Sequence, residues 1–152
     1  MKTIKAGAKA PTFDLPTQSG GRLSLETLLA QGPVVLFFYP VASSGGCTKQ
    51  ACHFRDLGTE FESVGAQRVG ISTDEVSAQK GFDDTQSLGY PLLSDTDGEV
   101  AKAYGVKRKY LTPVKRVTFV IDTDGTIRDV ISSELNFTVH ADQALASLKT
   151  AS

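Results

Sequence analysis

The chain has 152 residues, of which 40% are hydrophobic and 22% charged, and its formal net charge is −1. This size and composition are typical of one globular domain spanning residues 1–152, and they exclude a disordered or membrane-embedded chain. A net charge near zero provides no general attraction to nucleic acid or to an anionic membrane, so we expect small-molecule chemistry.

The N-terminal part of the chain predicts a hairpin, a helical turn and a buried strand. Residues 13–15 and Leu23 flank the turn-rich segment PTQSGG, which indicates a short N-terminal β-hairpin. Leucines between residues 25 and 29 predict a helical turn. The run VVLFFY at 34–39 is apolar on both faces, as in a central strand of a parallel sheet.

The middle of the chain predicts a β-α-β crossover. Apolar residues recur at spacings of three and four over 51–64, which indicates one amphipathic helix that ends near Gly65. The run RVGIST at 68–73 predicts the second strand. Asp74 is a candidate N-cap for the next helix, which carries apolar residues on one side over 76–82.

The C-terminal part predicts a loop at 90–94 and a short helix at 100–104 that ends at Gly105, a residue favoured at helix C-termini. The runs at 117–122 and 126–132 bracket a Thr-Asp-Gly turn and predict a β-hairpin.

Apolar residues over 141–148 predict a closing helix. The resulting order is that of an α/β, thioredoxin-like fold, with a central mixed β-sheet flanked by helices. A fold alone does not determine a function.

Cys47 follows the first buried strand and lies at the start of the helix after it. The carboxyl end of such a strand opens onto the crevice where ligands bind, and a helix N-terminus stabilises a thiolate. The alternative is a small buried apolar cysteine, which is the commoner fate of a lone cysteine. The position of Cys47 favours the reactive interpretation.

Cys52 lies five residues after Cys47. Helix geometry separates their Cα atoms by about 8.7 Å, with side chains about 140° apart around the axis. A disulfide needs Cα atoms within roughly 7 Å, so pairing would require the first helical turn to unwind. The alternative is that Cys52 packs beside Ala51 and never meets Cys47, and the spacing leaves both interpretations open.

Several motifs resemble those of the peroxiredoxins, and more narrowly of peroxiredoxin Q, also called bacterioferritin comigratory protein. They include the pattern Pro40-x-x-x-Ser44-x-x-Cys47 and the run GCTKQACHFRD at 46–56. The similarity continues through the runs VGIST, YPLLSD, YGV and RVTFVIDTDG, which cover nearly the whole chain.

The resemblance implies a role for five residues. Cys47 is the peroxidatic cysteine, Cys52 is the resolving cysteine of the same subunit, and Ser44 provides the hydroxyl of the pattern. Pro40, which has no N–H group, shields the site, and Arg116 is the arginine of the site. A hydroxyl and a guanidinium can hold both peroxide oxygens and stabilise charge on the leaving oxygen.

Two sequence features depart from the pattern or compete with it. Gly45 replaces the proline that relatives commonly carry, and glycine allows the loop more conformations, so we expect an effect on efficiency and not on the reaction class. Arg116 ends the basic segment 107–116, so the alternative role for Arg116 is that of a solvated cation beside Lys107, Arg108, Lys109 and Lys115. The surface of this segment serves a partner or solubility.

The resemblance also implies substrates and partners. Hydrogen peroxide and organic hydroperoxides are reduced, thioredoxin or a similar dithiol recycles the enzyme, and no metal, haem or flavin is required. We expect a monomer that binds neither nucleic acid nor membranes. Residues 1–16 lack the apolar core of a secretory signal, and no run approaches the ~20 apolar residues of a membrane span, so we expect a cytoplasmic protein.

Three other functions are compatible with the residues. A non-enzymatic redox sensor or holdase could use the same cysteine pair, but it would show no sustained peroxide turnover. Cys47, Cys52 and His53 could bind zinc, although structural sites use four ligands at closer spacings and His140 is distant in sequence. A Cys–His hydrolase is disfavoured because neither histidine lies in a recognisable nucleophile motif.

Overall fold

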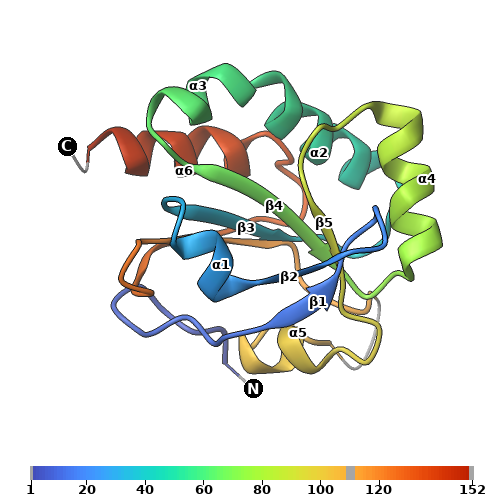
Figure 1. The fold of residues 1–152 in the computed structure, drawn as a ribbon, viewed down its shortest axis with the longest axis horizontal. Coiled ribbons are helices and arrows are strands. Elements are labelled where there is room, and N and C mark those ends of the chain that lie inside the picture. The colour runs from blue at the N-terminus through green and yellow to red at the C-terminus, as the bar shows by residue number, and fades with distance from the viewer. Residues whose placement is uncertain (1, 109–111, 151–152) are drawn as a thin grey trace.

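The computed structural model describes residues 2–108 and 112–150. A five-stranded mixed sheet forms the centre of the fold, in the order β5-β4-β3-β6-β7 (Figure 1). Its strands are β3 (Val34–Phe38), β4 (Gln67–Ser72), β5 (Leu92–Ser94), β6 (Val117–Ile121) and β7 (Ile127–Ser132). β4 pairs in parallel with β3 and β5, whereas β6 pairs antiparallel with β3 and β7. The predicted thioredoxin-like class is confirmed.

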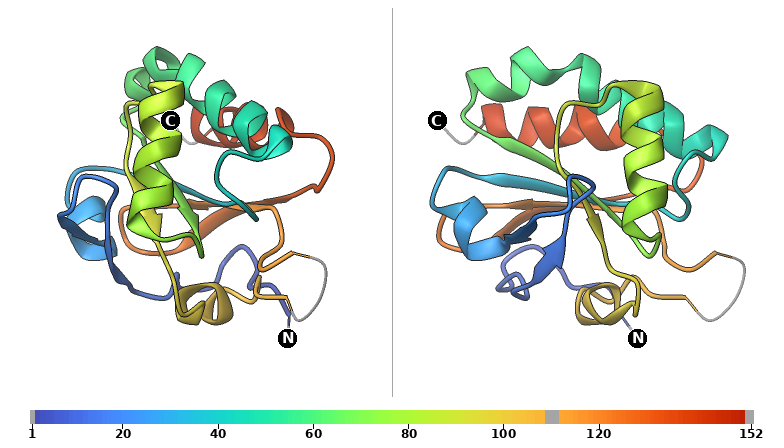
Figure 2. Two further views of the ribbon diagram at one scale, coloured as in Figure 1. Left: turned by 90° about the vertical axis from the view of Figure 1, so that its right-hand side faces the viewer. Right: turned by 45° about the vertical axis from the view of Figure 1, so that its right-hand side comes forward.

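Helices cover both faces of the sheet (Figure 2). One face packs against α2 (Gly45–Asp56), α3 (Gly58–Ser63), α4 (Val76–Gln86) and α6 (Val139–Lys149). The other face packs against α1 (Leu25–Leu29), α5 (Glu99–Ala103) and the N-terminal hairpin of β1 (Asp14–Pro16) and β2 (Arg22–Ser24). The predicted hairpins, the helices at both ends of the chain and the short helix before Gly105 are confirmed.

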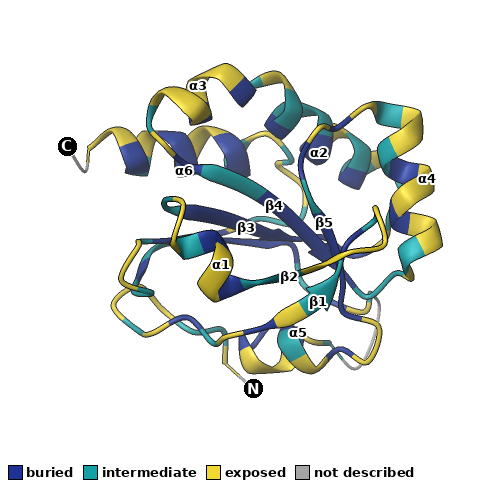
Figure 3. Cartoon of the chain, in the orientation of Figure 1, coloured by how far each residue is buried: buried dark blue, intermediate teal, exposed yellow. Residues whose placement is uncertain are grey.

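Strand β3 is the centre of both hydrophobic clusters, and all five of its residues are buried (Figure 3). Val34, Leu36 and Phe38 belong to the cluster on one face, and Val35 and Phe37 belong to the other. Each such side chain stabilises the fold by roughly 1.5–3 kcal/mol when it is fully buried. The two-sided apolar pattern therefore places β3 in the middle of the sheet, and the chain that leaves β3 starts from a rigid base.

The helix predicted over 51–64 is wrong in one respect, because two helices meet at Leu57. Arg68 lies against this break. Its Nη1 donates hydrogen bonds to the carbonyls of Phe54, at 3.0 Å, and Arg55, at 3.4 Å. In a continuous helix these carbonyls would accept from residues four positions later.

The segment predicted as a loop at 90–94 contains the edge strand β5, whose three residues are all buried. The helix cap predicted at Asp74 is also wrong. The N-cap of α4 is Glu75, which makes no side-chain capping bond. The carboxylate of Asp74 instead accepts hydrogen bonds from the backbone of Ala42 and from Ser72, as described below.

Within residues 2–108 and 112–150, no helix has both the length and the apolar character required to cross a bilayer.

Candidate active site

Cys47 lies in the first turn of α2, at the carboxyl end of β3. Ser44 is the N-cap of this helix, and its Oγ accepts a hydrogen bond of 3.3 Å from the backbone N–H of Cys47. A serine cap satisfies one of the unpaired N–H groups at a helix start and fixes where the helix begins. The Cys47 side chain is only 1% exposed, so its sulfur is held in a desolvated position at a helix N-terminus.

Arg116 is the residue immediately before β6, and it reaches across the sheet end to Cys47. Its Nη1 donates to the Sγ of Cys47 at 3.3 Å and to Oε1 of Gln50 at 2.7 Å. Arg116 is 6% exposed, so it is not part of a solvated basic surface. A buried guanidinium next to a thiol stabilises negative charge there more strongly than an exposed guanidinium would.

The loop between β3 and α2 is held by a hydrogen bond to the side chain of Asp74. Oδ2 of Asp74 accepts hydrogen bonds from the backbone N–H of Ala42 and from Oγ of Ser72, both at 2.7 Å. Pro40 is buried in this loop, and Ser43 has a φ of 67°, a left-handed conformation that non-glycine residues seldom adopt. These contacts set the path of the chain between β3 and Cys47.

Cys52 lies on the same uninterrupted helix and is partly buried. Its Sγ donates to Oε1 of Gln86 at 3.4 Å, so it contacts α4 and not the start of α2. Both cysteines are free thiols in this conformation. An intact α2 keeps them too far apart for a disulfide, as the spacing predicts.

The two histidines lie outside the thiol site. Nε2 of His53 pairs with Asp142 at 2.6 Å on the surface. His140 is buried, where its Nε2 donates to the carbonyl of Ser133 at 2.8 Å and its Nδ1 accepts from Thr118 at 2.9 Å. Among the residues that the structure describes, no three histidine, cysteine or acidic side chains are grouped to bind a metal ion.

Burial, with Arg116 nearby, lowers the pKa of His140 below its ordinary value of 6.5. The unfolded chain therefore binds a proton more readily than the folded one, and stability present above about pH 6.5 is lost as pH falls through the folded pKa. We expect the free energy of unfolding to decrease as the pH falls from about 6.5 through the folded pKa of His140. Urea unfolding as a function of pH should show a smaller decrease for His140→Gln, and an equal decrease would contradict the assignment.

Three residues that contact Arg116 were not predicted from the sequence: Gln50, Glu134 and Phe137. Gln50 is buried on α2 and binds Arg116. In the sequence, only its three-residue spacing from Cys47, which puts both on one face of the helix, connects it with the site. Glu134 accepts a hydrogen bond from the backbone N–H of Arg116, and it also forms an ion pair of 3.2 Å with Arg108 of the basic segment 107–116. Part of that segment is therefore bonded to the site, while Lys109 lies outside the described residues.

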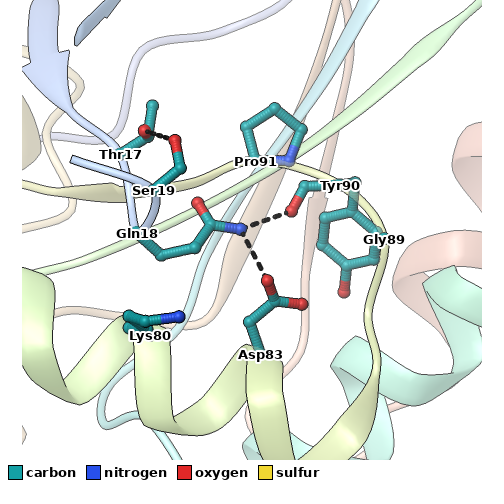
Figure 4. Close-up of a pocket in the computed structure, with 8 residues that line it drawn as sticks. All are labelled: Thr17, Gln18, Ser19, Lys80, Asp83, Gly89, Tyr90 and Pro91. Carbon is teal, nitrogen blue, oxygen red and sulfur yellow. Dashed lines mark hydrogen bonds between the residues drawn. The ribbon is translucent and has the colours of Figure 1, made fainter. Parts of the chain in front are cut away.

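A separate pocket lies between the turn of the N-terminal hairpin and α4 (Figure 4). The amide of Gln18 spans it, donating to the carbonyl of Tyr90 at 2.9 Å and to Asp83 at 3.2 Å. The Oε1 atom of Gln18 accepts from the backbone N–H of Leu92 at 2.8 Å. No cysteine is among the residues that line this pocket, and the polar atoms of the Gln18 amide are all bonded to the chain around it.

A free, buried thiol at a helix N-terminus on a thioredoxin-like sheet, in contact with an arginine, is the arrangement expected of a thiol-dependent oxidoreductase. The model of the AhpC/TSA family matches residues 6–130, and the chain belongs to this family. It is similar to peroxidoxin BcpB of Mycobacterium tuberculosis, whose crystal structure is 55% identical, with a TM-score of 0.95 over 98% of this chain and 99% of that one.

Three further comparisons place the chain among peroxiredoxins of the Q type, also called bacterioferritin comigratory protein. Peroxiredoxin Q of Xanthomonas campestris is 28% identical, with a TM-score of 0.86 over 98% of this chain and 96% of that one. Chloroplastic peroxiredoxin Q of Suaeda salsa is 37% identical over 97% of this chain and 69% of its own length. Another Xanthomonas structure, of bacterioferritin comigratory protein, concerns alkyl peroxide reduction; it is 28% identical, with a TM-score of 0.85 over 97% of this chain and 96% of that one. The protein is a peroxidase that uses thiol chemistry.

Proposed function

We propose that this peroxidase reduces hydrogen peroxide and organic hydroperoxides at Cys47 and is recycled through a Cys47–Cys52 disulfide. The contact of 3.3 Å between Arg116 and the Cys47 sulfur is the observation that carries the proposal. The guanidinium stabilises the thiolate and remains available to the oxygen on which charge develops. The alkyl peroxide activity named for the Xanthomonas relative supports the inclusion of organic substrates.

In the first step, the Cys47 thiolate attacks one oxygen of the peroxide. An S–O bond forms, the O–O bond breaks, and the second oxygen leaves with its electron pair and takes up a proton to give water or an alcohol. Sulfur is thereby oxidised to a sulfenic acid. Arg116 and Ser44 provide donors for the peroxide oxygens, and buried Pro40 offers no N–H that would compete for them.

In the second step, Cys52 attacks the sulfenic sulfur, so that an S–S bond forms and water leaves with the oxygen. Because α2 runs unbroken through both cysteines, its first turn must unwind. A dithiol such as thioredoxin then reduces the disulfide and is itself oxidised. Sulfur carries both electrons throughout, so the cycle requires no metal, haem or flavin. We place this monomer in the cytoplasm, without nucleic acid or membrane partners.

A coupled assay tests the proposal. Peroxide consumption is measured with thioredoxin, thioredoxin reductase and NADPH, and again without thioredoxin. Sustained consumption that depends on thioredoxin is expected. A single stoichiometric oxidation without turnover would indicate a redox sensor or holdase instead.

Arg116→Met keeps apolar bulk but removes the charge and the donors of the side chain. If one charged contact of about 1.5–3 kcal/mol is lost from the transition state, the second-order rate with peroxide falls by at least about tenfold. Arg22→Met is the matched control, since Arg22 is exposed and pairs with Asp14 on the hairpin. An unchanged rate in Arg116→Met would remove the arginine from the mechanism.

A further inference from the structure

The loop between β7 and α6, residues 133–138, contacts Arg116 through two of its residues, Glu134 and Phe137. The carboxylate of Glu134 accepts from the backbone N–H of Arg116 at 3.0 Å, and its carbonyl accepts from Nε at 3.3 Å. The ring of Phe137 lies over the guanidinium, with 4.8 Å between its centroid and Cζ. Arg116 is therefore held by the Cys47 sulfur, by Gln50 and by this loop.

The same phenylalanine packs on the first turn of α2. A Cβ atom built on Gly46 would lie 2.6 Å from both Cε1 and Cζ of Phe137, and 3.3 Å from Nη2 of Arg116. Real Cβ atoms do not approach a ring so closely, so only glycine allows the ring to sit here. Phe137 thus contacts both the arginine and the residue directly before Cys47, although it lies far from both in sequence.

We propose that Phe137 is a positioning residue with two effects: it holds Arg116 against the Cys47 sulfur, and it clamps the first turn of α2 in its helical form. The inference rests on the proposed roles of Cys47 and Cys52. A ring over a desolvated guanidinium is attracted to its charge and restricts its orientation. Packing on Gly46 stabilises the one turn that must open before the disulfide forms.

The two effects act on different steps and in opposite directions. A well-oriented Arg116 speeds the attack on peroxide, because its donors are already in place. A clamped first turn slows disulfide formation, because the contact of Phe137 with Gly46 must be lost before Cys47 can move. Weakening the ring contact should therefore slow the first step and speed the second, which a general loss of stability would not do.

Phe137→Leu keeps apolar bulk but removes the aromatic face. The attack of Cys47 on hydrogen peroxide should slow by about three- to tenfold. Disulfide formation should become faster, by at least about threefold.

The chain contains no tryptophan, so we would follow both steps by rapid quenching with a thiol-alkylating reagent and intact-mass analysis. The observed rate of the first step increases with peroxide concentration, whereas the rate of disulfide formation does not depend on it. Leu135→Ala is the control, since Leu135 lies on the same loop and is 85% exposed.

A second variant pair tests whether Phe137 acts through Arg116. When Arg116 is already methionine, Phe137→Leu should no longer slow the peroxide step, but it should still speed disulfide formation. The same slowing in both backgrounds, unchanged rates in Phe137→Leu, or a slowing of both steps with a lower melting temperature would each overturn the inference. Failure of the wild-type Cys47 thiol to react with peroxide would instead remove the proposed function, and with it the basis of the inference.

Discussion

Replacement of Cys47 by serine is expected to abolish peroxide reduction. A hydroxyl is far less acidic than a thiol, and its oxygen cannot accept a second oxygen as sulfur does, so neither the nucleophile nor the sulfenic acid can form. The change removes no packing other than that of the larger sulfur atom. A serine Oγ at this buried position can also accept the hydrogen bond that Arg116 now donates to the sulfur. We therefore expect a folded, inactive protein.

The measurement is peroxide consumption in the thioredoxin-coupled assay, together with a thermal unfolding curve for each protein. Wild-type protein should turn over, and Cys47→Ser should match the rate without enzyme while it still unfolds cooperatively. Cys52→Ser is the matched control, because it makes the same atomic change at the other cysteine and should keep one round of reaction. Retained turnover in folded Cys47→Ser would remove the central claim.

Much of the fold is predictable from the sequence because one strand determines its centre. The apolar run at 34–39 has no polar face, which is compatible only with a strand covered on both sides, and β3 is buried throughout. Helix and hairpin patterns around it then leave few arrangements. The break at Leu57 could not be predicted in this way, because the apolar spacing continues through it and the side chain that bonds the end of α2, Arg68, belongs to a strand.

The residues of the site also differ in whether local sequence or tertiary structure places them. The positions of Cys47 and Ser44 follow from local chain order, since a serine three residues before a cysteine can cap its helix. Arg116 is 69 positions from Cys47, and only a family motif connects the two in sequence. The contacts of Glu134 and Phe137 with Arg116 have no local pattern at all. They depend on where the loop after β7 returns to the sheet end, which only the tertiary structure shows.

The conformational part of the mechanism is tested by Cys52→Ser. This variant should react once with peroxide, because Cys47, Arg116 and their surroundings are unchanged, but it should then stall without a resolving thiol. Thioredoxin-dependent turnover should be lost. The sulfenic acid then has more time to meet a second peroxide molecule, so sulfinic and sulfonic forms of Cys47 should accumulate, visible as added oxygens by intact mass.

Under the same treatment, the wild-type protein should lose two hydrogens and gain no oxygen. Amide exchange should also rise over residues 44–52, because an unbroken α2 holds the cysteines about 8.7 Å apart at Cα and its first turn must open for the bond to form. Cys47→Ser, which cannot be oxidised at that position, should show neither change. The mechanism would be refuted by normal turnover in Cys52→Ser, or by a wild-type disulfide that forms while the first turn stays protected from exchange.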